Sequence, residues 1–366
     1  MSSLFGPIFG ESAIADATSD RALLRALCDA EAALAEACAH VGLIESHQAA
    51  AVAKACAELA AMDPAELGLE AVAGGNPVIP LARRLQSAVP QAHFGATSQD
   101  ILDTALMLIS RDALALVVTD LRAIETAVAS LADAHRSTPM IGRTLLQQAI
   151  PTTFGALAAI WGMSFVRVIE GLSLELPAQV GGAAGTMAGW HPHGFEVRAR
   201  YAENLGLVDP GYVWHTDRTP VTQLAGALGS AAAAIAKVAT DIVLLSQSEI
   251  AEVSEQAPGG SSAMPHKQNP IAAITARASA AQAPGLVATL LAAGSPELQR
   301  GAGPWHAEWP ALVSLLRATG GAANRLRTSI EGLRVDPARM ARALGPGFDL
   351  GHAVETVDRY LSRRTQ

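Results

Sequence analysis

Residues 259–270, with the sequence GGSSAMPHKQNP, combine residue types that bind anions and move protons. Their glycines and prolines predict a loop, because neither belongs in a helix or strand interior. Consecutive glycines let backbone N–H groups turn toward one point, where they favour an anion. Lys267 adds a positive charge and Asn269 adds amide donors. The loop is therefore suited to holding a carboxylate while an oxygen of Ser261 moves a proton.

Two further polar segments interrupt the apolar stretches of the sequence. Residues 93–104, HFGATSQDILDT, lie at the predicted start of a long helix, where free N–H groups and the helix dipole attract anions. The same residues also fit a simple capped helix start, since Thr97-x-x-Asp100 resembles a capping box. The other segment is residues 142–147, GRTLLQ. All three segments separate long helices, so a bundle, or copies from neighbouring subunits, would bring them together.

The helices expected to position these segments are long. Residues 101–138 contain neither glycine nor proline and would span about 57 Å as one helix at 1.5 Å per residue. No stretch shows sustained period-two alternation, so few strands are expected. Helices of this length are stable only in bundles. Further helices are expected at 23–41, 47–62, 151–177, 220–258, 271–292 and 305–330. A weak point is expected in the last of these at Gly320-Gly321, and an irregular, interrupted segment is expected over 64–90.

Composition narrows the class of protein. The 366 residues are 50% hydrophobic and 16% charged with a net charge of −8, which favours helices buried against helices, often between subunits. An acidic chain argues against nucleic-acid binding. No signal peptide or membrane span is expected, and three sparse cysteines indicate packing residues rather than disulfides. We expect a soluble cytoplasmic protein without a metal site, because no metal-ligand spacing is present.

Together the three segments resemble the fumarase/aspartase superfamily over roughly residues 10–330. The 259–270 loop carries that family's signature, and Thr97-Ser98-x-Asp100-x-x-Asp103-Thr104 matches its first motif. The resemblance implies an all-α fold built on a long antiparallel helix bundle. It implies a small N-terminal helical domain at 1–92, the bundle at 93–332 and a short remnant of a truncated C-terminal helical domain at 333–366. It also implies a homotetramer whose active sites are assembled from three subunits.

The resemblance also assigns roles within the site. Ser261 would be the catalytic base, while Lys267 and Asn269 hold the substrate carboxylate as it gains enolate-like charge. Fixed donors at that point stabilise the transition state more than the ground state. Local positive charge and exclusion of water would make the serine oxygen basic. Further carboxylate ligands implied by the same motifs are Thr97, Ser98 and Gln147.

The 142–147 segment indicates a subgroup. Many lyases of the superfamily carry Thr-His-x-Gln here, but this chain has Leu145, which cannot transfer a proton. That difference argues against argininosuccinate and adenylosuccinate lyase activity. The Arg-Thr-Leu-x-Gln form resembles 3-carboxy-cis,cis-muconate cycloisomerases, as do residues 93–100 and 214–218. In their reaction a substrate carboxylate attacks a double bond and the adjacent carbon takes a proton. An internal carboxylate is a weak base and needs no acid partner.

A substrate with three carboxylates requires additional cations. The candidates for this clamp are Arg143, Arg218 and Arg300, each suited to bidentate binding. A structural arginine is the alternative for each. Asn76 would line the site or form a plain turn. His93 and His215 would bind substrate, shuttle protons or be structural.

The function implied is closure of 3-carboxy-cis,cis-muconate to 4-carboxymuconolactone in aromatic-acid catabolism, without metal or organic cofactor. Three alternatives remain open. The substrate could be 3-sulfomuconate, because a sulfonate requires the same cations. The chain could be another lyase of the superfamily, or a non-catalytic helical scaffold.

Overall fold

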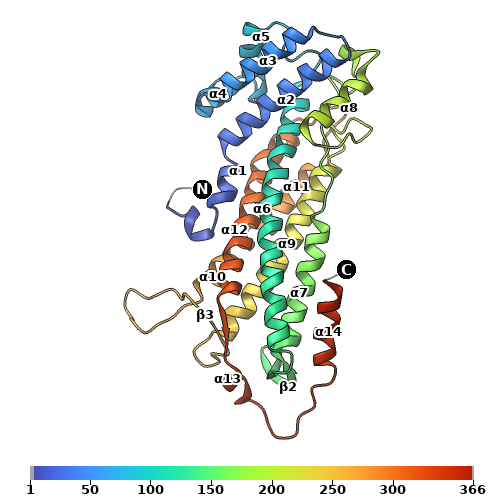
Figure 1. The fold of residues 1–366 in the computed structure, drawn as a ribbon. Helices are drawn as coiled ribbons and strands as arrows, with labels where there is room; N and C mark the ends of the chain where they lie inside the picture. The colour runs from blue at the N-terminus through green and yellow to red at the C-terminus, as the bar shows by residue number, and fades with distance from the viewer. Residues whose placement is uncertain (1–3, 365–366) are drawn as a thin grey trace.

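The computed structural model describes residues 4–364, and long helices packed side by side dominate it (Figure 1). The strands in this part of the chain form two small antiparallel sheets, one pairing β1 with β2 and one pairing β3 with β4. The all-α bundle expected from the sequence is therefore confirmed. The bundle helices are α6 (Ser98–Ala134), α7 (Phe154–Gly171), α9 (Thr219–Leu245), α10 (Ile271–Ala280), α11 (Ala283–Ala293) and α12 (Pro304–Glu331). The strands are β1 (Pro139–Thr144), β2 (Gln147–Thr153), β3 (Val253–Glu255) and β4 (Leu333–Val335).

The longest described helix, α6, contacts both α7 and α12. Its 37 residues contain no glycine or proline and span about 55 Å. The predicted capping box is present, since the Thr97 N–H donates to Asp100 Oδ2 at 3.0 Å. Most of its apolar side chains are buried, Ile101 and Leu121 completely. Helix start, length and buried face therefore follow from local sequence.

A layer of shorter helices covers the end of the bundle where α6 begins (Figure 1). Two of them, α4 and α5, lie within residues 64–90, so the expectation of an irregular segment there is wrong. Asp63 caps α4 through the Ala65 N–H, and Pro64 occupies the first helical position, where proline is tolerated. The helices of this end are α2 (Asp20–His40), α3 (Ser46–Leu59), α4 (Pro64–Ala71), α5 (Val78–Ala88) and α8 (Gly194–Leu205), with the short 3-10 turn η2 (Ala188–Trp190).

Two expectations for the later helices need correction. The helix expected over 271–292 is two helices, because Pro284 lies in the first turn of α11 and cannot continue α10. Conversely, α12 runs unbroken through Gly320-Gly321. A Cβ on Gly321 would lie 2.5 Å from the Phe9 carbonyl oxygen, so this glycine permits close packing rather than a bend. The contacting segment comprises η1 (Gly6–Phe9) and α1 (Ser12–Ala17).

The last residues dock on the bundle. After α13 (Pro337–Ala341) the chain forms α14 (Ala353–Arg363), which packs on α7. A Cβ on Gly162 would lie 2.1 Å from the Tyr360 ring, so only glycine admits this contact. The Tyr360 hydroxyl donates to Glu125 at 2.7 Å. The C-terminal residues are therefore helical and anchored to the bundle.

Two helices, α7 and α9, are long and apolar enough to cross a membrane by length and composition alone. Both lie within the bundle, where α7 contacts α6 and α9 contacts α12. Within this chain 44% of each apolar window is buried. Burial in a helical core accounts for part of their apolar character, and their remaining faces are free to pack on other surfaces.

Candidate active site

The start of α6 brings together four of the residues expected to bind substrate. Arg300 Nη1 donates to Thr97 Oγ1 at 2.7 Å, and Arg300 Nη2 donates to the Ala183 carbonyl at 3.1 Å. Ser98 is the first residue of α6, and His93 lies in the turn just before it. A guanidinium and a hydroxyl therefore meet at a helix N-terminus, with Ser98 and His93 adjacent in the chain, a combination that suits a carboxylate.

Asp100 fixes this end of the site in place. Its carboxylate is buried and accepts hydrogen bonds from the backbone N–H groups of Thr97, Gly181 and Gly182 at 3.0, 2.8 and 2.9 Å. The fourth contact is His215 Nε2 at 2.8 Å. This contact anchors His215 beside Asp100, and its Nδ1 is buried without a hydrogen-bond partner among the described residues. Asp100 joins α6 to the glycine-rich segment beside Arg300.

Arg218 is not a substrate clamp, and that expectation is corrected. Its side chain is 2% exposed and lies over the Trp214 ring. Its Nη1 and Nη2 donate to Asp103 at 2.7 and 3.1 Å, and its Nε and Nη2 donate to Glu308 at 3.0 and 2.6 Å. All its donors are used inside the bundle. The resulting Arg218–Asp103–Glu308 cluster ties α6 to α12.

Asn76 is likewise a structural residue, as its alternative assignment allowed. Its Oδ1 accepts the N–H groups of Val78 and Ile79 at 3.1 and 3.3 Å, which begins α5. Its Nδ2 donates to the Gly74 carbonyl at 3.4 Å. These hydrogen bonds all serve its own turn, which leaves one amide N–H for a ligand.

The β1–β2 hairpin carries the second polar segment. Arg143 makes a bidentate pair with Glu252, at 2.9 and 2.7 Å. Arg143 and the exposed Gln147 line a cavity of about 700 Å³ together with Arg339 and Arg342. The hairpin tip is Leu145-Leu146, whose φ angles of 51° and 64° are left-handed and whose side chains are 95% and 69% exposed. Such strained, exposed leucines indicate a tip shaped to meet another surface.

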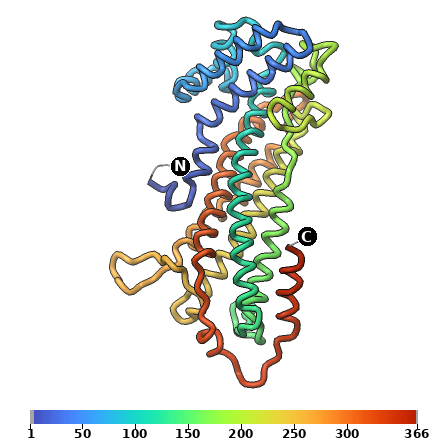
Figure 2. Tube along the Cα trace, in the orientation of Figure 1, coloured from blue at the N-terminus to red at the C-terminus, as the bar shows by residue number. Residues whose placement is uncertain are grey.

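The 259–270 loop projects from the bundle beyond α10 (Figures 1 and 2). Gly259 and Asn269 close its base with two backbone hydrogen bonds of 2.8 and 2.9 Å, and the Asn269 amide donates to the Gly259 and Gly260 carbonyls at 3.3 Å. Ser261 Oγ accepts the N–H groups of Ala263 and Met264 at 3.3 and 3.1 Å. These donors stabilise negative charge on that oxygen. Lys267 is exposed and makes no ion pair with a described residue.

The start of α6 lies apart from the other two polar segments within one chain. The hairpin follows the far end of α6, about 55 Å from Thr97. The 259–270 loop follows α9, whose 27 residues lead about 40 Å away from Arg218. A single chain therefore presents separate parts of a site.

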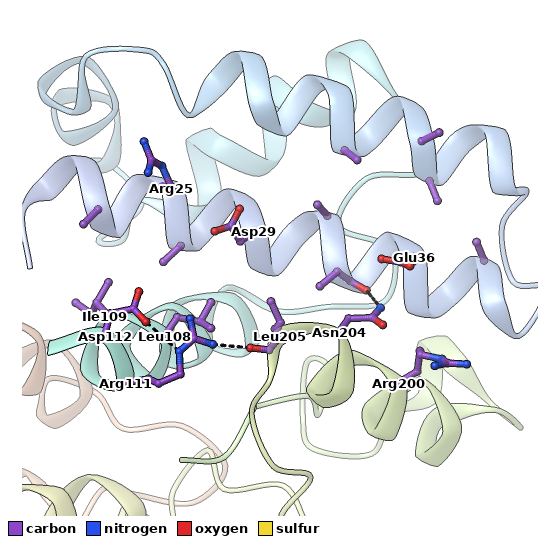
Figure 3. Close-up of a pocket in the computed structure, with 18 of the residues that line it drawn as sticks. Arg25, Asp29, Glu36, Leu108, Ile109, Arg111, Asp112, Arg200, Asn204 and Leu205 are labelled. Atoms are coloured by element: carbon purple, nitrogen blue, oxygen red, sulfur yellow. Dashed lines mark hydrogen bonds and ion pairs between the residues drawn. The ribbon is translucent and has the colours of Figure 1, made fainter. Parts of the chain in front are cut away.

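A different cavity, of about 1090 Å³, opens between α2, α3, α8 and residues 108–112 of α6 (Figure 3). Its charged lining includes Asp29, Arg111 and Arg200, and none of the residues expected to bind substrate contributes to it. Within residues 4–364, no group of three or more His, Cys, Asp or Glu side chains is placed to hold a metal ion.

Sequence reasoning missed the acidic partners of the site, Glu31, Glu252 and Glu308. Glu31 contacts His93 Nδ1 through Oε1 at 2.6 Å and is fully buried on α2. It follows Leu27 by four positions and precedes Leu34 by three, so helical periodicity alone places a carboxylate on the buried face. That pattern was the available signal.

Comparison with known proteins places the chain in a family. The family pattern described as lyase matches residues 8–285. A 3-carboxy-cis,cis-muconate cycloisomerase from Bradyrhizobium diazoefficiens is 41% identical over 93% of this chain and 78% of its own length. A nitrosuccinate lyase from Streptomyces davaonensis is 40% identical over 93% of this chain and 76% of its own length. The crystal structure of the β-carboxy-cis,cis-muconate cycloisomerase of Acinetobacter calcoaceticus matches with a TM-score of 0.86 at 34% identity, covering 93% of this chain and 80% of that one. With this signature loop, fold and sequence similarity, the chain belongs to the lyase family of the fumarase/aspartase superfamily.

Proposed function

We propose that this protein is a cycloisomerase that converts 3-carboxy-cis,cis-muconate into 4-carboxymuconolactone. The observation that carries the proposal is 41% identity, over 93% of the chain, to an enzyme of that name. The exposed Leu145 at the hairpin tip supports it, because ring closure by an internal carboxylate needs no acid at that position. The place of this reaction would be the breakdown of aromatic acids.

In the proposed reaction one substrate carboxylate oxygen bonds to a carbon of the double bond. The neighbouring carbon, next to a second carboxylate, gains the electron pair and takes a proton from Ser261. The alkoxide left on Ser261 is stabilised by the N–H groups of Ala263 and Met264 and by Lys267. A proton from solvent restores the hydroxyl and completes the turnover, and in the reverse direction the alkoxide acts as the base. The charge that develops on the carboxylate is held by Lys267 and by Asn269, whose amide must first release the Gly259 and Gly260 carbonyls.

The remaining carboxylates are assigned to the other two polar segments. Thr97, Ser98 and Arg300 would hold one at the start of α6, where they lie together. Arg143 and Gln147 would approach from the hairpin. Arg143 already pairs with Glu252, so its part in binding requires that pair to share or release the guanidinium.

We propose that the active enzyme is a homotetramer with sites shared among three chains. The separation of the polar segments along α6 and α9 supports this assembly, since no single chain unites them. We also propose a cytoplasmic location. Its support is the presence of three buried free cysteines, which suits a reducing compartment.

The test is ultraviolet absorbance of the conjugated diene of 3-carboxy-cis,cis-muconate, with purified wild type and Ser261→Ala. Wild type is expected to consume the diene and release the lactone, and Ser261→Ala is expected to lose most of the rate. The same assay with 3-sulfomuconate measures the preference between carboxylate and sulfonate. No turnover of either muconate by wild type would overturn the proposal and favour a scaffold.

A second candidate is nitrosuccinate cleavage, because the nitrosuccinate lyase is as similar to this chain as the cycloisomerase is. The assay therefore includes nitrosuccinate, argininosuccinate and adenylosuccinate. A higher kcat/KM on any of these three compounds than on the muconates would replace the cycloisomerase assignment with a lyase.

A further inference from the structure

A buried carboxylate, Glu31, pairs with His93 just before the start of α6. Glu31 is 0% exposed, and its Oε1 lies 2.6 Å from His93 Nδ1. Its second oxygen, Oε2, is buried without a hydrogen-bond partner among the described residues. A buried carboxylate is costly unless a positive charge balances it. His93 is the group placed to supply that charge.

The backbone at His93 is held in an unfavourable conformation. Its φ of 57° is left-handed, which non-glycine residues rarely adopt and which concentrates at functional sites. The turn that follows is fixed by packing, since a Cβ on Gly95 would lie 2.7 Å from Trp190 Nε1. The strain therefore places this imidazole against Glu31 and just before Thr97.

The helix α2 presents two different faces. Asp29 and Glu36 line the large cavity of Figure 3, whereas Glu31 is absent from that lining and turns toward His93. The His93 side chain remains 13% exposed. Because Nδ1 contacts Glu31, the ring nitrogen left for a ligand is Nε2, which makes no hydrogen bond to a described residue.

The charges facing His93 favour the imidazolium. Burial alone would lower the pKa of His93, but the charge and hydrogen bond of Glu31, with Asp100 on α6, outweigh it and raise that pKa above its ordinary value. Asp100 is shared with His215. Tyr201 on α8 also faces these two carboxylates, and burial raises its pKa, so it stays neutral.

We propose that Glu31 is a positioning residue: it orients His93 as an imidazolium whose Nε2–H binds an anionic group of the substrate beside Thr97 and Arg300. The inference rests on the proposed function for the identity of that group, a carboxylate or a sulfonate. His93 would thus supply a cation to the residues that bind the anionic groups of the substrate, a set that does not include Arg218. Glu31 itself does not touch the substrate.

The first experiment needs no substrate. Histidine ring NMR of wild type, with the His93 signal assigned by its absence in His93→Gln, gives the pKa of His93 directly. The expected value lies above the ordinary value of about 6.5. Glu31→Gln is expected to lower the pKa of His93, because burial is then opposed only by the charge of Asp100, while the His135 signal stays unchanged. A wild-type pKa below 6.5 would overturn the proposal even if Glu31→Gln failed to fold.

The second experiment measures KM and kcat on 3-carboxy-cis,cis-muconate against pH. Wild-type KM is expected to rise as pH passes through the pKa of His93. Glu31→Gln should raise KM roughly ten- to hundredfold at pH 7.5, the size of a lost charged hydrogen bond, with a smaller change in kcat. Glu31→Asp should recover part of this loss.

The matched control is Glu11→Gln, which removes another fully buried carboxylate whose oxygens have no partner among the described residues. It should leave KM and its pH profile unchanged. An unchanged KM in a folded Glu31→Gln protein, or an equal rise in Glu11→Gln, would refute the positioning role. Failure of the proposed function is distinct, because wild type would then turn over no muconate while the NMR result still stood.

Discussion

The start of α6 and the 259–270 loop differ in how their own chain supports them. At the start of α6 the carboxylate of Asp100 accepts three backbone N–H groups and contacts His215. The Arg218–Asp103–Glu308 cluster below it is almost fully buried. In the 259–270 loop, by contrast, the hydrogen bonds close the loop on itself, and Lys267 faces solvent.

This difference indicates a division of labour. The end that would hold the substrate carboxylate is preorganised within one chain, so binding there requires little rearrangement. The loop that would move the proton has its serine and its N–H donors in place, and Lys267 and Asn269 line an open cavity of about 960 Å³ beside β3 and β4. Exclusion of water around Ser261 must come from other surfaces, which in the proposed tetramer belong to neighbouring copies.

The largest expected effect is on the loop side. Ser261→Ala should reduce turnover about 10²- to 10⁴-fold, because it removes the group that transfers the proton. Its free energy of unfolding should be unchanged, since Ser261 Oγ bonds only within its own loop. Stopped-flow or steady-state absorbance and chemical denaturation measure the two quantities. A lower free energy of unfolding for Ser261→Ala than for wild type would mean that Ser261 has a structural role in the loop.

The next effect belongs to the buried side. Arg218→Met should lower the free energy of unfolding by about 3–5 kcal/mol, because Asp103 and Glu308 would be left buried without their cation. Denaturant titration measures the change. Arg84→Met, which removes an exposed ion pair with Glu70, is the control and should change stability little. If Arg218→Met and Arg84→Met changed the free energy of unfolding equally, the buried cluster would not hold the start of α6 in place.

A smaller effect is expected at the hairpin tip. Leu145→Asp should weaken assembly by about 1.5–3 kcal/mol for each tip, the value of burying one apolar side chain. The tip is 95% exposed within the chain, so the unfolding of the isolated subunit should not change. Light scattering against concentration gives the assembled mass. An unaltered mass with full activity would show that the tip meets no partner.

The smallest effect concerns pH. Burial opposes and Glu31 supports the charged form of His93, and the pKa is raised in the folded state. The stability from this pair is therefore fully present below the unfolded pKa of about 6.5 and is lost as pH rises through the folded pKa. Denaturation of wild type and Glu31→Gln at pH 5.5 and pH 9 should show the larger difference at pH 5.5. A larger difference at pH 9 would reverse the assignment.

Local patterns predicted much of the fold. The length of α6 follows from the absence of glycine and proline, its start from the Thr97 and Asp100 spacing, and the 259–270 loop from its composition. The helices α4 and α5 were missed because short helices with proline in or just before their first turn carry little periodicity. Gly320 and Gly321 were misread as a weak point because their packing partners, Ile14 and Phe9, lie far away in sequence.

The site was less accessible to sequence reasoning. Arg218 has the residue type of a carboxylate clamp, but its partners lie 115 and 90 positions away, so its role depends on the packing of three helices. Glu31 similarly meets a histidine 62 positions later. Sequence motifs locate the polar segments well. Which side chain pairs with which is set by tertiary contacts between residues far apart in sequence.

The central claim is that the two halves come from different chains, and mixing inactive variants tests it directly. Ser261→Ala lacks the loop function, and Arg300→Met combined with Thr97→Val lacks the function at the start of α6. The account predicts that unfolding and refolding the two proteins together restores activity, because some sites then combine an intact loop with an intact α6 start. If the refolded mixture stays as inactive as each variant refolded alone, the sites are not shared between chains.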